Sequence, residues 1–299
     1  MHKRTKFGGI IPAIITPLQD NGRIDESLLS KQIEYLCSKG VDGFFINGTT
    51  GEGGFLTTEE KIQVLKIARE VVGNHRFLCA ACIQSSTELV LKEIRAFEPL
   101  QPDFIVAVTP YYYSVTQDTI FEHFRMISEH SPFPVIVYNI PQCTHNPIHL
   151  ETILKLSKLD NIIGTKDSSG DFVSFVRGIA SETTENFSWV QGNDYLDGPA
   201  LLVGAKGIVT GLGNVWIEPY IEMWDVYKRG NYSEIMEKQK LINDLYRIIE
   251  AVPDKLIGAI KAAVTALGRA SKWTKVPSMS VTDEEYSRVK NVMKEIGLL

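Results

Sequence analysis

The feature that most constrains this chain is a regular alternation between short strand-like runs and longer helix-like segments. Eight strand-like apolar runs occur before residue 211, at 9–16, 43–47, 76–83, 103–109, 134–140, 162–166, 187–191 and 207–210. The segments between them are periodic and begin with capping signals, such as Thr57-Thr58-Glu59-Glu60. This pattern predicts a parallel sheet whose strands are joined by helices.

Eight strand–helix units are the number that closes a (β/α)8 TIM barrel, an α/β fold. An open, doubly wound sheet is the alternative, and it is disfavoured because no Gly-x-Gly-x-x-Gly motif follows the first strand. From about residue 227 only helical patterns remain, at 231–249, 254–267 and 282–296. We therefore expect a catalytic barrel over residues 1–226 and a region of three helices over residues 227–299.

Composition limits the partners that this chain can have. The net charge of −5, with no basic cluster, argues against a nucleic-acid surface. No apolar run reaches the ~18 residues that a membrane span needs. Basic residues before an apolar stretch imitate a signal peptide, but Gly8, Gly9 and Pro12 interrupt that stretch, and a first barrel strand explains it better. We expect a cytoplasmic protein.

The four cysteines, Cys37, Cys79, Cys82 and Cys143, suggest reduced thiols in such a protein. Cys79 and Cys82 have the spacing of a redox or metal motif, but they lie inside an apolar run with no Gly or Pro between them. Residues three apart on a strand point to opposite faces. We therefore expect both to be packing residues.

The sixth run ends in a single lysine, in Gly164-Thr165-Lys166-Asp167. In an α/β barrel the C-terminal ends of the strands carry the chemistry. A lysine enclosed there loses the hydration that favours its charged form, and a neutral amine can attack a ketone to form a Schiff base. The ordinary alternative is a lysine that reaches solvent or pairs with Asp167, which is more common for a strand-end lysine taken alone.

Three other strand ends are unusual. The second run ends in Gly48-Thr49-Thr50-Gly51-Glu52, where glycines let successive N–H groups converge on an anion; a turn without a ligand explains it equally well. The fifth run ends in Tyr138-Asn139-Ile140-Pro141, so a phenol is expected near Lys166, where it can relay protons. Taken alone, a core tyrosine is the commoner case. Three tyrosines, 111–113, follow the fourth run and could form a lid.

Together these strand ends supply an anion cradle, an amine nucleophile and a phenol relay. Such a set can bind a 2-oxo acid, form an imine with its ketone and make or break a neighbouring C–C bond. No HxH, HExxH or acidic cluster indicates a metal, and the lysine supplies the electron sink that a cofactor would otherwise supply. We therefore expect no cofactor.

The order and context of these motifs resemble the N-acetylneuraminate lyase / dihydrodipicolinate synthase family of class I, pyruvate-dependent aldolases. The likeness covers nearly the whole chain, and the three motifs around Thr49, Tyr138 and Lys166 carry it. The resemblance implies that Lys166 is the Schiff-base lysine and Tyr138 the proton relay. Thr49 and Thr50, with Gly48 in the same loop, would bind the pyruvyl carboxylate, and Thr50 would help to relay protons.

The resemblance also implies an assembly. Tyr112 matches a tyrosine that family members lend across a tight dimer interface, so it counts among the expected catalytic residues. Family members are usually tetramers built as a dimer of dimers. We therefore expect a homotetramer with two small-molecule partners, pyruvate and an aldehyde.

Departures from the family pattern bear on the aldehyde. Dihydrodipicolinate synthases carry an arginine two residues after the Tyr-Asn-x-Pro proline, where Cys143 stands here. A thiol cannot replace a bidentate cationic contact to a carboxylate. Sialic acid lyases follow strand seven with an Asp-Glu pair, which is Asp194-Tyr195 here, and His145 replaces the usual glycine after Thr144.

What remains is a set of hydroxyl-binding candidates, namely Asp194, Thr210, Gln142 and Thr144, with no evident cation for a second carboxylate. The first hypothesis is therefore an aldolase that cleaves a 2-keto-3-deoxy sugar acid to pyruvate and an aldehyde such as glyceraldehyde. The alternatives are sialic acid lyase, a sugar-acid dehydratase, dihydrodipicolinate synthase acting on aspartate semialdehyde, and a pyruvate-binding scaffold without turnover.

Overall fold

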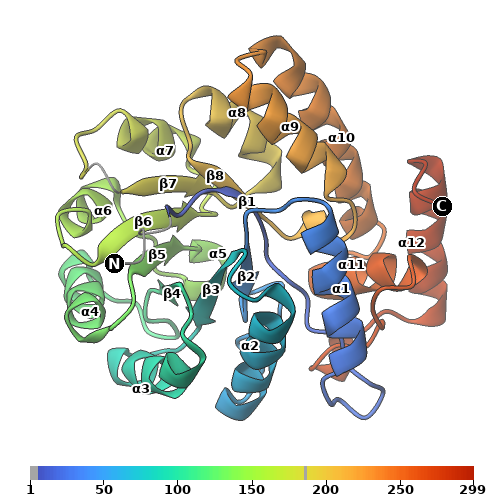
Figure 1. Cartoon of the computed structure of the whole chain (residues 1–299), viewed down its shortest axis with the longest axis horizontal. Helices are drawn as coiled ribbons and strands as arrows, with labels where there is room; N and C mark the ends of the chain where they lie inside the picture. Colours follow the sequence, from blue (N-terminus) through green and yellow to red (C-terminus); the bar gives the residue numbers. More distant parts are fainter. Residues whose placement is uncertain (1–5, 185–186) are drawn as a thin grey trace.

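Eight parallel strands form a barrel in the computed structural model, which describes residues 6–184 and 187–299 (Figure 1). The strands are β1 (Gly9–Pro12), β2 (Gly43–Ile46), β3 (Phe77–Cys82), β4 (Phe104–Val108), β5 (Val135–Asn139), β6 (Ile162–Asp167), β7 (Ser188–Gln191) and β8 (Gly207–Thr210). From β2 to β8 each strand pairs with the next along the chain, and β1 pairs with β8. A parallel bridge between Ala13 and Phe45 links β1 to β2. The TIM barrel is confirmed, and the open sheet is wrong because both of its edges are occupied.

Helices surround the barrel (Figure 1). They are α1 (Glu26–Ser38), α2 (Thr58–Val72), α3 (Thr87–Phe97), α4 (Gln117–His130), α6 (Leu150–Leu156), α7 (Phe172–Ile179), α8 (Asp197–Leu202) and α9 (Glu218–Lys228). The predicted start of α2 is confirmed, because Thr57 and Glu60 form a reciprocal capping box. The short helix α5 (Pro141–Thr144) follows β5 directly and was not expected from the sequence.

The first strand is shorter than predicted, because β1 ends at Pro12 rather than at residue 16. Beyond it the chain leaves the regular ladder. Ile14 N donates to Phe45 O at 3.0 Å, and Ile15 N donates to the side chain of Asn214 at 3.2 Å. A side chain thus replaces a strand partner, which an apolar pattern does not reveal.

Two layers of apolar side chains follow from the alternation along each strand. One cluster, with Ile11, Phe45, Val106 and Val209, fills the barrel, and a larger one joins the outer faces of the strands to the helices. Cys79 belongs to the first cluster and Cys82 to the second. The prediction that these cysteines pack on opposite faces is therefore confirmed.

Three helices end the chain, as predicted: α10 (Ile235–Glu250), α11 (Leu256–Ala266) and α12 (Asp283–Glu295). They lie together on one side of the barrel (Figure 1), where α10 packs on α8 and α9. The boundary between residues 226 and 227 stays a prediction. Within the described residues, no helix is both long and apolar enough to cross a membrane.

Candidate active site

Lys166 and Tyr138 lie side by side at the C-terminal ends of β6 and β5. The parallel register pairs them directly. The Lys166 Nζ atom lies 4.0 Å from the centre of the Tyr138 ring and 4.4 Å from that of Phe45. Lys166 is only 4% exposed and Tyr138 2%. The lysine is therefore enclosed by aromatic faces inside the barrel mouth and does not extend into solvent.

Asp167 does not pair with this lysine, because its side chain turns to the other face of β6. Its Oδ2 accepts a hydrogen bond from Asn139 Nδ2 at 2.9 Å, and its Oδ1 accepts from Ser169 N and Oγ. Burial raises the pKa of the Asp167 carboxyl, and these hydrogen bonds oppose that rise. Asn139 Oδ1 in turn accepts from Ile148 N at 3.1 Å.

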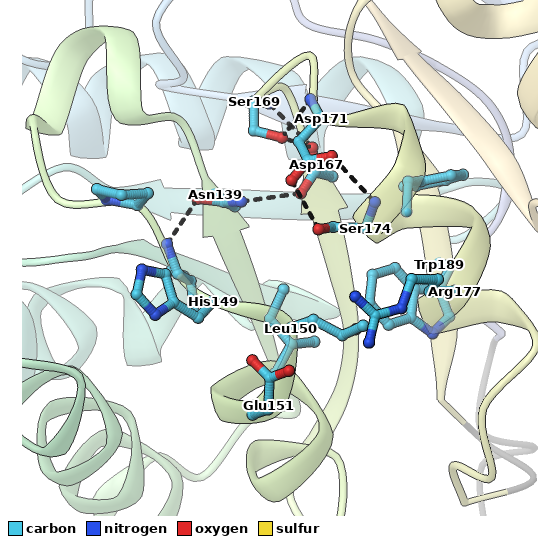
Figure 2. Close-up of a pocket in the computed structure, with 14 residues that line it drawn as sticks. Asn139, His149, Leu150, Glu151, Asp167, Ser169, Asp171, Ser174, Arg177 and Trp189 are labelled. Carbon is cyan, nitrogen blue, oxygen red and sulfur yellow. Dashed lines mark hydrogen bonds between the residues drawn. The ribbon is translucent and has the colours of Figure 1, made fainter.

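The Asn139–Asp167 bridge faces a pocket of about 200 Å³ between α6 and α7 (Figure 2). The bridge ties together the ends of β5 and β6, one residue beyond Tyr138 and Lys166. The sequence motifs contain both residues, but they indicated only a pairing of Asp167 with Lys166 and no role for Asn139. The alternation of side chains along a strand could have indicated the bridge, because it turns Asn139 and Asp167, which follow Tyr138 and Lys166, to the outer face of the barrel.

The loop of residues 48–53 follows β2 and carries Thr49 and Thr50, of which Thr50 is nearly buried and Thr49 is half-buried. Gly53 N donates to Gly48 O at 2.9 Å, so the loop closes on itself. A Cβ atom on Gly53 would lie 1.7 Å from Asn47 O, and one on Gly48 would lie 2.5 Å from the Phe45 ring. Close packing therefore requires these two glycines, whereas anion binding by the loop stays a prediction.

Asp194 and Thr210 are brought together at the ends of the seventh and eighth units. Thr210 Oγ1 donates to Asp194 Oδ1 at 2.5 Å, and the hydroxyl of Tyr220 donates to the same oxygen at 2.7 Å. All three side chains are buried. Burial raises the pKa of Asp194, while these hydrogen bonds and the charge of Lys166 oppose the rise. The carboxylate therefore already has protein partners.

The other two predicted hydroxyl-binding side chains also have partners within the chain. Gln142 Nε2 donates to Ser168 O at 2.6 Å. Thr144 is buried and donates to Ile140 O at 3.2 Å. A substrate hydroxyl would have to share or displace these bonds.

Cys143 lies on α5 with its side chain exposed. Partial burial of its sulfur raises the pKa of the thiol, while the charge of nearby Lys166 opposes the rise. The neighbouring His145 has a φ of 58°, so the replacement of the usual glycine keeps a left-handed backbone at this turn.

Tyr112 is not packed into the mouth of its own barrel. Its side chain is 84% exposed, and its backbone has a φ of 82°, which is uncommon for a bulky residue. Its ring meets that of Tyr113 edge to face, with centres 4.9 Å apart.

Asp197 is a buried acidic residue that the sequence motifs did not single out. It is fully buried, and neither of its carboxyl oxygens has a hydrogen-bond partner among the described residues. Burial raises its pKa well above the usual range, and the charge of Asp194 adds to that rise. The only sequence signal was an acidic residue at the start of an otherwise apolar helix.

Comparisons with known proteins agree over nearly the whole chain. The sequence model of the dihydrodipicolinate synthetase family matches residues 6–296. A 4-hydroxy-tetrahydrodipicolinate synthase of Syntrophus aciditrophicus is 31% identical, with 98% of this chain and 99% of the relative covered. The enzyme of the same name from Methanothrix thermoacetophila is 29% identical, with 97% of each chain covered.

Solved structures of dihydrodipicolinate synthases also match nearly the whole chain. The dihydrodipicolinate synthase of Thermotoga maritima superposes with a TM-score of 0.92 at 26% identity, over 99% of this chain and all of the other. That of Acinetobacter baumannii, solved in complex with pyruvate, gives 0.92 at 26% identity, over 98% of this chain and all of the other. The chain therefore belongs to the dihydrodipicolinate synthetase family, whose members are class I lyases that form a Schiff base with pyruvate.

Proposed function

We propose that Lys166 forms a Schiff base with pyruvate and that the chain makes or breaks a C–C bond at the neighbouring carbon. The observation that carries this proposal is the enclosed Lys166 amine, 4.0 Å from the centre of the Tyr138 ring on the adjacent strand. A buried amine beside a phenol combines a nucleophile with a proton relay. Family membership favours an enzyme over a binding scaffold.

In this mechanism the pyruvyl carboxylate binds to the 48–53 loop through Thr49, Thr50 and the main-chain N–H groups. The neutral Lys166 amine adds to the ketone, and the phenol of Tyr138, helped by Thr50, transfers the protons that allow water to leave. The electrons of the breaking C–C bond then move into the protonated imine, which becomes an enamine, and the hydroxyl on the departing carbon passes its proton to Tyr138 as the aldehyde forms. Condensation with an aldehyde is the reverse of that step.

For the aldehyde, we propose a neutral, hydroxylated compound such as glyceraldehyde, so that the substrate cleaved is a 2-keto-3-deoxy sugar acid. Cys143 supports this proposal, because a thiol cannot make the bidentate cationic contact with which an arginine at this position would bind a second carboxylate. Asp194 and Thr210 are the polar groups proposed to bind substrate hydroxyls. This activity would place the chain in carbohydrate acid metabolism.

The second candidate is the condensation of pyruvate with aspartate semialdehyde. The comparisons favour it over sugar-acid cleavage, because the relatives quoted above carry the name 4-hydroxy-tetrahydrodipicolinate synthase. For this candidate another group must bind the carboxylate of the aldehyde in place of an arginine at position 143. N-acetylneuraminate lyase remains a third possibility, supported by Asp194 and weakened by Tyr195.

We also propose that the chain assembles as a dimer of dimers in which Tyr112 enters the site of the partner subunit. The exposure of Tyr112 and its strained backbone support this, because such strain persists where it serves a purpose. Exposed aromatic side chains such as Tyr112 and Tyr113 are also typical of a protein interface.

A panel of aldehydes decides between these candidates. The purified protein is incubated with pyruvate and either glyceraldehyde, N-acetylmannosamine or aspartate semialdehyde, and product formation is measured. We expect the highest kcat/KM with glyceraldehyde, and we expect Cys143→Arg to shift the preference towards aspartate semialdehyde. Efficient condensation of aspartate semialdehyde by the wild type would refute the argument from Cys143 and support the second candidate.

A further inference from the structure

A buried ion pair connects the 48–53 loop to the C-terminal helices. Lys261 of α11 pairs with Glu52, and both side chains are completely buried. The other carboxylate oxygen of Glu52 accepts a hydrogen bond from Lys275 N at 2.6 Å. Lys261 Nζ also donates to Trp273 O at 2.7 Å. The loop is thus joined to a part of the chain more than two hundred residues away.

The backbone of Glu52 explains why this link matters for the loop. Its φ is 61°, a left-handed conformation that is uncommon for a residue other than glycine. Glu52 N donates to Thr49 O at 3.0 Å, and Thr16 Oγ1 donates to the neighbouring Gly51 O at 2.7 Å. Such a backbone persists only when its surroundings hold it in place. Here the surroundings are the side-chain contacts of Glu52 with the C-terminal region.

The pair is costly to disrupt from either side. Removing one partner leaves a buried charge without compensation, which is strongly destabilising. Burial lowers the pKa of Lys261, and the charge of Glu52 opposes that fall. The conformation of the chain around Glu52 therefore depends on the ammonium group of Lys261 in α11.

We infer that Glu52 and Lys261 are positioning residues, through which the C-terminal helices hold the 48–53 loop in the shape that binds the carboxylate of the 2-oxo acid. This inference rests on the proposed function, in which Thr49 and Thr50 contact that carboxylate. Neither Glu52 nor Lys261 contacts the reacting atoms in this account. Their loss should weaken binding of the 2-oxo acid more than it slows the chemistry.

The chain offers a matched control in a second buried ion pair. Lys61 of α2 and Glu93 of α3 lie 2.7 Å apart with both side chains 1% exposed. This pair joins two helices and does not include a residue of the 48–53 loop. Replacing Lys61 should therefore cost stability through the same mechanism, without changing the geometry of the carboxylate site.

The experiment measures how trapping of pyruvate by borohydride at Lys166 depends on pyruvate concentration, which does not require the aldehyde to be known. We expect Lys261→Met to raise the half-saturating pyruvate concentration about tenfold or more, with little change in trapping at saturation. We expect Lys61→Met to lower the melting temperature by about as much as Lys261→Met does. We expect it to leave the half-saturating pyruvate concentration unchanged.

A double variant covers the case in which Lys261→Met does not fold. Glu52→Leu combined with Lys261→Met removes both buried charges, so it should fold. It also removes the acceptor for Lys275 N, so the half-saturating concentration should still rise. The inference is wrong if this concentration is unchanged in the folded variants, or rises equally in Lys61→Met. If the wild type traps no pyruvate at all, the proposed function fails, which is a different result.

Discussion

Among single residues, the amine of Lys166 and the phenol of Tyr138 on the neighbouring strand are the groups proposed to carry the chemistry. The register that pairs Tyr138 with Lys166 follows from the order of the strands, so the adjacency of the two residues could be predicted from the strand-end motifs. The hydrogen bonds that Thr210 and Tyr220 donate to Asp194 could not be predicted from the sequence. That cluster depends on a hydroxyl from α9, whose position is set by packing and has no local signal.

The first prediction concerns the phenol. Tyr138→Phe removes the hydroxyl and keeps the ring that packs against Phe45 with centres 5.8 Å apart. We expect kcat to fall by about two to four orders of magnitude, the usual range for a positioned acid–base group. This fall in kcat, measured by steady-state kinetics, together with an unchanged melting temperature would confirm that Tyr138 relays protons. Full activity in the variant would show that another group relays them.

The second prediction concerns His123, which is buried and uncharged. Its ring contacts Thr87 Oγ1 at 2.8 Å and Val108 O at 3.1 Å. Burial lowers its pKa from 6.5 to about 4. Between these values the unfolded chain binds a proton that the folded chain does not, so stability falls as pH drops from 6.5 towards 4.

The size of this effect follows from the shift, and it is at most about 3 kcal/mol. We expect the free energy of unfolding in urea to decrease between pH 6.5 and 4 by up to this amount more in the wild type than in His123→Gln. Parallel pH profiles for the two proteins would show that His123 does not carry the acid sensitivity.

At the scale of elements, most of the fold was predictable. The β2, β8 and α2 boundaries agree with their apolar runs and capping signals to within a residue or two. The prediction was less accurate at β1, where Asn214 replaces a strand partner, and at α5, which is a single turn. The end of β1 depends on a residue distant in sequence. The helix α5 is too short to show a helical period in its sequence.

The third prediction tests how the strand ends hold the proposed catalytic pair, Tyr138 and Lys166. Asn139→Ala removes the bridge to Asp167 and leaves a buried carboxylate oxygen without a donor, which costs about 1–3 kcal/mol. Since Tyr138 and Lys166 precede the bridged residues, we also expect kcat to fall about ten- to a hundredfold.

Asn161→Ala is the matched control for this variant. Its amide donates to Ser128 O, Ser131 O and Phe133 O just before β5 and β6 begin, at the opposite end of the barrel. We expect this variant to lose comparable stability and to keep its kcat. An equal loss of kcat in both variants would show that the Asn139 bridge has no special effect on the catalytic pair.

At the scale of the whole molecule, the exposed tyrosines lead to a prediction about assembly. Tyr113 is 73% exposed and contacts Tyr112, whereas Tyr232 is 54% exposed next to α10. We expect sedimentation velocity to show dimers or tetramers of the wild type and of Tyr232→Asp, and smaller species of Tyr113→Asp. A monomeric wild type at micromolar concentration would refute the proposed exchange of Tyr112 between subunits.

The most direct test of the central claim is reduction of the protein with sodium borohydride in the presence of pyruvate, followed by peptide mass spectrometry. A reduced imine locks the pyruvyl group onto the amine that formed it. We expect one added pyruvyl group on the peptide that contains Lys166, and none in Lys166→Arg. An unmodified protein at saturating pyruvate, or an adduct on a different lysine, would contradict it.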